Sequence, residues 1–157
     1  MHPCFHHRDT ESTEWDGGIY PDRMKWNRTI KWIMLVAGLL TLTMIFVVVA
    51  PEAAMRKNFG IGIDSPAMEI VVRNWGALIA LVGAMLVYGA FHPAVRPLVL
   101  TVAAASKTVF VALMLTRGRA YLGLDIGAAV VIDSIEIVLF VLFLFVSQSN
   151  DRSTAAR

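Results

Sequence analysis

The chain has 157 residues, of which 57% are hydrophobic and 17% are charged. Soluble domains contain about 45–50% apolar residues with glycine included and about 25% charged residues, so this composition excludes a water-facing surface of ordinary polarity. The formal net charge is +2, the basic residues do not cluster, and no nucleic-acid-binding motif occurs. We therefore expect an all-α integral membrane protein with no nucleic-acid partner.

Residues 1–29 precede the first apolar stretch, and residues 1–22 mix acidic side chains with two adjacent glycines and show no apolar period. This composition predicts a disordered cytoplasmic segment. A signal peptide has basic residues directly before its apolar run, and that arrangement begins only at Met24, so we do not expect residues 1–22 to be a signal peptide. Whether translation starts at Met1 or at Met24 stays open.

Four potential metal ligands lie near the N-terminus: His2, Cys4, His6 and His7. Structural zinc sites use two separated pairs of ligands on a scaffold, whereas these residues form a single cluster. We therefore expect no metal site here.

Four apolar stretches follow, at about residues 32–51, 70–91, 97–116 and 126–147. Each is long enough to cross a bilayer core of about 30 Å as a helix of roughly 20 residues. The first two have no polar face of the kind that a buried helix of a soluble protein needs. The sequence therefore predicts a four-helix transmembrane bundle over residues 30–147, with residues 148–157 as a cytoplasmic tail.

Helix-capping signals mark the connections. Ser65 is suited to the N-cap of the second span, with Pro66 at its first helical position. The segment PEAAMRKNFG follows the first span, with Pro51 suited to a first helical turn and Gly60 to a C-cap. This segment is either a short interfacial helix on the outer surface or an ordinary connector.

Lysine and arginine residues near the span ends predict the orientation in the membrane. One side holds seven of them: Arg23, Lys25, Arg28, Lys31, Arg96, Arg152 and Arg157. The other side holds five: Arg56, Lys57, Arg73, Arg117 and Arg119. We therefore expect a multi-pass protein of the cell inner membrane with both termini in the cytoplasm.

Three ionisable residues lie near the middle of predicted spans: Lys107 in the third, and Asp133 and Glu136 in the fourth. An ionisable side chain at the bilayer centre costs about 2.5–3.5 kcal/mol on insertion scales, so such residues usually face the bundle interior and find a partner. Asp125, Asp133 and Glu136 share one face of the fourth helix. Because spans three and four are adjacent and antiparallel, we expect Lys107 to pair with Asp133 or Glu136.

One lysine against two carboxylates leaves a negative charge without compensation. Either one carboxyl group keeps its proton at neutral pH, which we favour, or a second cation reaches the cluster. Arg73 is the candidate for that cation, although Glu69, four residues earlier, is placed to engage it.

Small residues recur at four-residue spacing in the second span, at Gly76, Ala80 and Ala84. They allow close helix packing, either within the chain or against a second copy or another membrane partner. No catalytic motif and no haem-binding histidine pair occur, so we expect no catalytic residues and no cofactor.

The motifs PEAAMRKNFG, VVRNWGALIALVGAMLVYGAF, Ser106-Lys107 and VVIDS together resemble the DoxX-like superfamily of small four-helix membrane proteins. The resemblance covers roughly residues 30–147. It implies a bacterial cytoplasmic-membrane bundle, in a group sometimes linked to quinone or thiol redox systems. It carries over no catalytic residues.

The leading hypothesis for function is a non-catalytic binder of a lipid-like or quinone-like ligand, or an accessory subunit of a membrane redox system. Lys107, Asp133, Glu136, Arg73 and Asp125 are the candidate ligand-binding or proton-handling residues. Two alternatives stay open. One is a membrane isomerase using the paired carboxylates, and the other is a proton-coupled carrier of small solutes.

Overall fold

The computed structural model describes residues 20–155, and the side chains within residues 26–147. The elements are α1 (Tyr20–Leu42), α2 (Ile45–Val49), α3 (Pro51–Phe59), α4 (Pro66–Phe91), η1 (Pro93–Val95), α5 (Arg96–Thr116), η2 (Arg119–Tyr121) and α6 (Asp125–Ala155). The described part of the chain is therefore all-helical, as expected. Four segments are long and apolar enough to cross a membrane: Trp26–Val49, Pro66–Phe91, Pro93–Thr116 and Asp125–Ser147.

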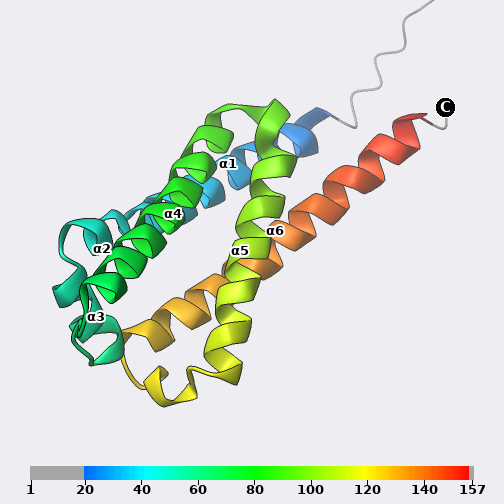
Figure 1. Ribbon diagram of the computed structural model, residues 1–157. Coiled ribbons are helices and arrows are strands. Elements are labelled where there is room, and N and C mark those ends of the chain that lie inside the picture. Colours follow the sequence, from blue (N-terminus) through cyan, green and yellow to red (C-terminus); the bar gives the residue numbers. More distant parts are fainter. Residues whose placement is uncertain (1–19, 156–157) are drawn as a thin grey trace, which may run out of the picture.

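The long helices form two packed pairs. Helix α4 lies along α1 and α2, and α5 crosses α6 (Figure 1). Contacts between α4 and α5 join the pairs, and the short helix α3 touches both α4 and α6. As a result, α3 bridges the two pairs at one end of the molecule.

Glycines set the distance between α1 and α4. A Cβ atom at Gly83 would lie 2.6 Å from the backbone nitrogen of Leu42 and 2.9 Å from the carbonyl oxygen of Gly38. A Cβ atom at Gly76 would lie 2.6 Å from the Cβ atom of Val47 in α2. Gly76 and Ala80 are buried within the chain, whereas Ala84 is exposed. The small residues of this helix therefore serve packing inside the chain at two of the three predicted positions.

The first apolar stretch contains a break that the sequence analysis did not predict. Helix α1 ends at Leu42 and α2 begins at Ile45. The hydroxyl of Thr43 donates to the carbonyl oxygen of Leu40 at 2.6 Å, and the Met44 amide donates to Thr41 with three-residue spacing. Threonine hydroxyls that bond back to the preceding turn bend helices, which gives a local cause for the break.

Helix α1 also begins earlier than expected. Residues 20–29, which we placed in a disordered segment, are helical, so the expectation is wrong for this part. Pro21 lies in the first turn, where proline is tolerated, and no glycine or proline follows before the apolar stretch, so the helix continues into it. Residues 1–19, with the histidine and cysteine cluster, lie outside the described residues.

The predicted caps are confirmed. The hydroxyl of Ser65 accepts a hydrogen bond from the Met68 amide at 3.2 Å, and Pro66 is the first residue of α4. Helix α3 runs from Pro51 to Phe59, and Gly60 ends it in the left-handed conformation with φ 70°. This segment is therefore helical, and its place at the outer membrane surface stays a prediction.

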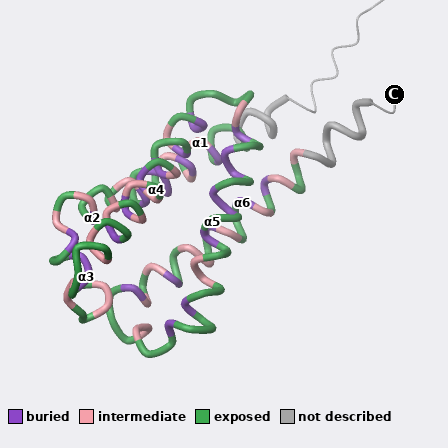
Figure 2. The backbone as a smooth tube through the Cα atoms, viewed as in Figure 1, coloured by how far each residue is buried: buried purple, intermediate pink, exposed green. Residues whose placement is uncertain are grey.

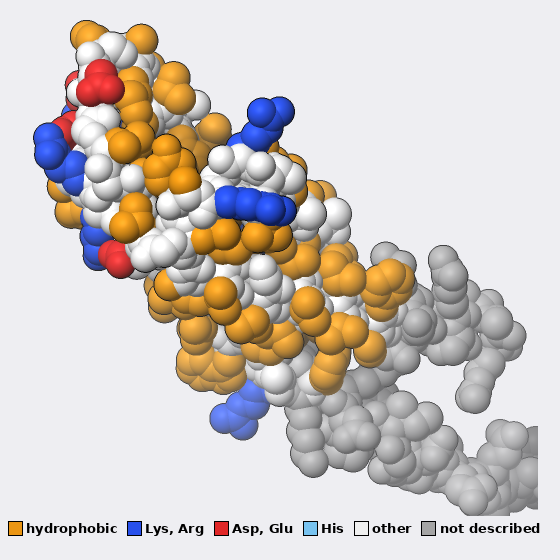
Figure 3. All heavy atoms as spheres, turned by 90° about the horizontal axis from the view of Figure 1, so that it is seen from below, with side chains coloured by type: hydrophobic (Ala, Val, Ile, Leu, Met, Phe, Trp, Pro, Cys, Tyr) orange, Lys and Arg blue, Asp and Glu red, His pale blue; other side chains and the backbone are white. Residues whose placement is uncertain are grey.

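The largest buried apolar cluster lies where α1, α4, α5 and α6 come together, and its fully buried members include Met34, Leu86, Leu100 and Phe140. Exposed and buried residues alternate along every long helix (Figure 2). Hydrophobic side chains cover most of the visible surface, and the acidic side chains seen there lie toward the α3 end (Figure 3). An exposed apolar surface of this extent is typical of helices that face lipid.

Candidate functional site

A pocket of about 480 Å³ lies between the two helix pairs; we call it the central pocket. All the long helices and α3 contribute to its walls. Apolar side chains make up most of them: Leu40, Met44, Trp75, Ile79, Val82, Phe110, Ile126, Ala128, Ala129 and Ile132. The polar lining residues are Thr41, Thr43, Lys57, Asn58, Ser106, Lys107, Asp125, Asp133 and Glu136.

Lys107, Asp133 and Glu136 form a compact group in this pocket, the central cluster. The Lys107 ammonium donates a hydrogen bond to Oδ1 of Asp133 and lies 2.8 Å from Oε2 of Glu136. It also donates to the hydroxyl of Thr41 in α1 at 3.3 Å. The predicted ion pair is therefore confirmed, and the lysine contacts both acids rather than one.

The central cluster is withdrawn from the surface. The side chains of Lys107, Asp133 and Glu136 are 8%, 18% and 10% exposed. Oε2 of Glu136 is buried and receives no well-directed hydrogen bond, although the lysine nitrogen is close by. Lys107 therefore compensates the charge of Glu136, while its directed hydrogen bonds go to Asp133 and Thr41.

Helix α3 and the start of α6 form the polar end of the pocket. Lys57 lies 3.8 Å from Asp125, and both side chains are well exposed. Beside them, the ring of Phe59 packs against two other aromatic rings. Its centroid lies 6.1 Å from the ring centroid of Trp75 in α4 and 5.4 Å from that of Tyr121 in η2. Aromatic contacts of this kind hold α3 against both helix pairs.

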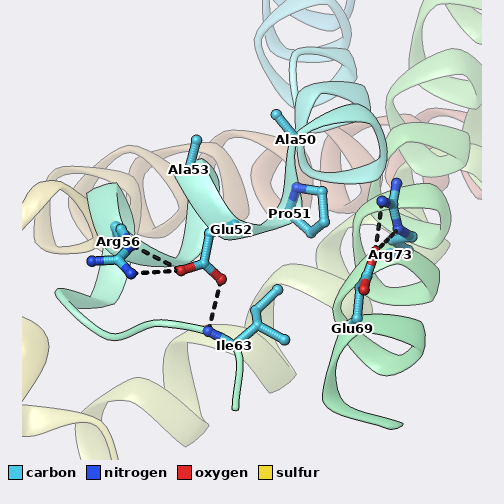
Figure 4. A pocket seen from close by; sticks show the side chains of 8 residues that line it. All are labelled: Ala50, Pro51, Glu52, Ala53, Arg56, Ile63, Glu69 and Arg73. Atoms are coloured by element: carbon cyan, nitrogen blue, oxygen red, sulfur yellow. Dashed lines mark hydrogen bonds and ion pairs between the residues drawn. The ribbon is translucent and has the colours of Figure 1, made fainter. Parts of the chain in front are cut away.

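Arg73 does not line the central pocket. Its guanidinium binds Glu69 at 2.7 Å and donates to the carbonyl oxygen of Val48. It faces a second, more open hollow beside α3, where Glu52 and Arg56 form another pair (Figure 4). The predicted pairing of Arg73 with Glu69 is confirmed, and this pairing directs the arginine away from Lys107, Asp133 and Glu136.

Glu52 organises the connection between α3 and α4. Its Oε2 accepts a hydrogen bond from the Ile63 amide at 2.8 Å, and its Oε1 accepts one from Arg56 at 2.8 Å. The Ile63 hydrogen bond, followed by the one from Arg56, lowers the pKa of Glu52 below its ordinary value of 4.5.

Four of the five candidate residues thus meet in one pocket: Lys107, Asp133 and Glu136 at its buried part, and Asp125 at its exposed end. The shared face predicted for the three acids is confirmed. Thr41 and Lys57 were not among the candidates. A threonine in an apolar span gives no sequence signal for this contact, and Lys57 was considered only for membrane orientation.

The pocket has the general form of a small-molecule site, with apolar walls and a few convergent polar groups. Within residues 26–147, no group of three or more histidine, cysteine or acidic side chains could hold a metal ion. The proton expected on one carboxyl of the central cluster stays a prediction.

The fold and the pocket define a class: an all-helical chain whose four long apolar helices fit a multi-pass membrane protein. No family model matches the chain, and no curated protein or solved structure shows significant similarity to it.

Proposed function

We propose that this protein is a four-helix membrane bundle that binds a small amphipathic molecule in the central pocket. The ligand has an apolar body, which packs between the helix pairs, and one polar end, which meets Lys107, Asp133 and Glu136. The single observation that carries this proposal is a pocket of about 480 Å³ with apolar walls and a buried charged group inside it.

Packing requirements alone do not explain this arrangement. A polar clamp between α5 and α6 needs one lysine and one acid, whereas two acids converge here, beside open volume. The volume is partly open to the outside, as the exposed lining residue Ala128 shows, so a ligand can reach it. Ionisable groups within a membrane usually mark a binding or conduction path. A bound ligand would fill the volume and supply a polar partner.

The wider setting belongs to the same proposal. We place the protein in the bacterial inner membrane with both termini in the cytoplasm, because of the excess of basic residues before the first span. The resemblance to DoxX-like proteins favours a lipid-like or quinone-like ligand and a role as an accessory subunit of a membrane redox system.

A pocket-filling variant tests the proposal without altering a charge. Ala128 lines the pocket and is exposed, so Ala128→Phe adds bulk to the open volume rather than to the packed core. The full chain is purified from membranes, and co-purifying small molecules are identified by mass spectrometry. We expect one amphipathic species with the native protein at roughly stoichiometric amount, and its loss in Ala128→Phe.

Ala84→Phe is the matched control, because Ala84 is an exposed alanine outside the pocket. This variant should retain the co-purifying molecule. If the native protein and both variants carry the same mixture of bulk lipids, the pocket has no specific ligand and the proposal is wrong.

A further inference from the structure

We infer that the polar end of the ligand is cationic, a lipophilic ammonium group that carries N–H donors. This inference rests on the proposed function, because it assigns a charge to a ligand of the central pocket. It follows from the balance of charges and of hydrogen bonds around Lys107.

The first step is the charge of the central cluster. Two carboxylates, Asp133 and Glu136, face one ammonium group. The other charged residues that line the pocket, Lys57 and Asp125, lie 3.8 Å apart and compensate each other at its exposed end. The lining residues from α1 and α4, and Thr43 and Met44 between α1 and α2, carry no charge. With both carboxyl groups ionised, one negative charge is in excess in the buried part of the pocket. A monocation on the ligand would balance this charge in place of the proton that we otherwise expect on one carboxyl, whereas a neutral or anionic ligand would not.

The second step is the hydrogen bonding of the lysine. Its ammonium group directs hydrogen bonds to Asp133 and to the hydroxyl of Thr41. Oε2 of Glu136 is left with a close ionic contact but no well-directed donor. An ammonium group on the ligand would supply that donor, since charge-assisted hydrogen bonds to carboxylates are the strong ones. Of the lipid-like and quinone-like ligands proposed above, the inference therefore favours a lipid-like amine, because a quinone carbonyl accepts hydrogen bonds and does not donate them.

The third step is the character of the walls. Trp75 and Phe110 line the same pocket as the acids, among aliphatic side chains. An apolar body therefore finds contacts along the pocket, and aromatic faces tolerate a nearby cation. A hydrophilic amine or a metal ion would gain nothing from these walls.

Three probes of matched shape test the inference: adamantan-1-amine, adamantan-1-ol and adamantane-1-carboxylate, which are cationic, neutral and anionic at neutral pH. Binding to the full chain in lipid nanodiscs is measured by equilibrium dialysis, with empty nanodiscs subtracted. We expect saturable binding of the amine, at least about tenfold tighter than that of the alcohol, and no saturable binding of the carboxylate.

Charge variants identify the source of the preference. Glu136→Gln leaves one lysine and one acid, so the amine should lose its advantage while the alcohol still binds, which shows that the pocket is intact. Asp133→Asn also leaves one lysine and one acid, so it should show the same loss of the amine preference with the alcohol still bound. The double variant Lys107→Gln/Glu136→Gln has one acid without a lysine, so the excess negative charge returns and amine binding should recover.

The outcomes separate the two proposals. Equal binding of amine and alcohol, or a Glu136→Gln variant that keeps the amine preference, would overturn the cationic ligand but leave an amphipathic ligand standing. A folded double variant that does not regain amine binding would also overturn it. Saturable binding of none of the probes would contradict both proposals.

Discussion

Lys107 is the residue on which the candidate site depends most. It is the only basic side chain that contacts Asp133 and Glu136 within residues 26–147. The sequence predicted this contact because three ionisable residues at similar depth in adjacent antiparallel helices have few other partners. It could not predict that both acids converge on the lysine, since that depends on side-chain rotamers and helix rotation.

Replacement of Lys107 by methionine keeps the volume of the side chain and removes its charge. Two buried carboxylates then face each other without a cation, and removal of one partner of a buried ion pair costs about 3–5 kcal/mol. We expect a clear loss of thermal stability for Lys107→Met in a membrane mimic, measured by the temperature at which the protein aggregates.

Lys57→Met is the matched control, because Lys57 lines the same pocket but is exposed and lies 3.8 Å from its partner. Exposed pairs contribute about 0–1 kcal/mol, so its stability should stay close to native. Equal effects of the two substitutions would show that the central cluster contributes no more than a surface ion pair.

Glu52 makes the α3–α4 connection sensitive to acid. Its pKa in the folded state lies below the ordinary value of 4.5, because the ionised carboxylate accepts hydrogen bonds from Ile63 and Arg56. A lowered folded-state pKa means that the carboxylate stabilises the fold above pH 4.5, and that this stabilisation is lost as the pH falls through the folded-state value. Hydrogen exchange at the Ile63 amide should therefore show protection at neutral pH that weakens in acid.

In Glu52→Gln the amide oxygen does not titrate, so any remaining protection of Ile63 should not change with pH in this range. A native-like acid sensitivity in Glu52→Gln would assign the effect to another group.

At the scale of elements, the positions of the helices follow closely from the long apolar stretches, from Ser65 and Pro66, and from Pro51 and Gly60. The break between α1 and α2 does not. Thr41 and Thr43 are isolated in an apolar run, and only the packed structure shows that Thr43 bonds back to Leu40 while Thr41 contacts Lys107. The local hydrogen bond of Thr43 gives a cause for the break, and the tertiary contact of Thr41 lies beside it.

The α1–α4 pair depends on Gly83. A Cβ atom there would meet backbone atoms of Leu42 and Gly38 at 2.6–2.9 Å, and backbone cannot yield as a flexible side chain can. Gly83→Ala should therefore lower stability by about 1–3 kcal/mol, measured by chemical unfolding in detergent. Gly123→Ala is the control, because a Cβ atom at Gly123 meets nothing within 4 Å. If Gly83→Ala is as stable as Gly123→Ala, α1 and α4 are not in close contact there.

Arg96 fastens the end of α4 to the start of α5. It is buried, and its guanidinium donates to the carbonyl oxygens of Gly89 and Ala90 and to the side chain of Asn27. A lysine ammonium group cannot reproduce the geometry of these three guanidinium hydrogen bonds. Arg96→Lys should therefore lower the free energy of unfolding by about 2 kcal/mol in the same assay. Arg119→Lys alters an exposed arginine that also binds a carbonyl, and should change stability by less than about 0.5 kcal/mol. Similar losses for both would show that the hydrogen bonds of the buried Arg96 contribute no more than that of an exposed arginine.

For the whole molecule, the number, order and approximate length of the apolar helices could be predicted from the four long apolar stretches of the sequence. The pairing of α1 with α4 and of α5 with α6, and the pocket between the pairs, could not. They depend on where glycines permit close approach, at Gly38 and Gly83, and on the bridge that Phe59 makes between the pairs. The sequence indicated the charged residues of the site but not the volume beside them.

A ligand in the central pocket is the central claim, and site-specific photo-crosslinking in native membranes tests it most directly. A photoreactive phenylalanine analogue is placed at Phe110, which lines the pocket, or at Val109, which is 60% exposed at the same depth of α5. We predict one dominant small-molecule adduct at position 110 that is absent at position 109. The same mixture of bulk lipid adducts at both positions would contradict the account.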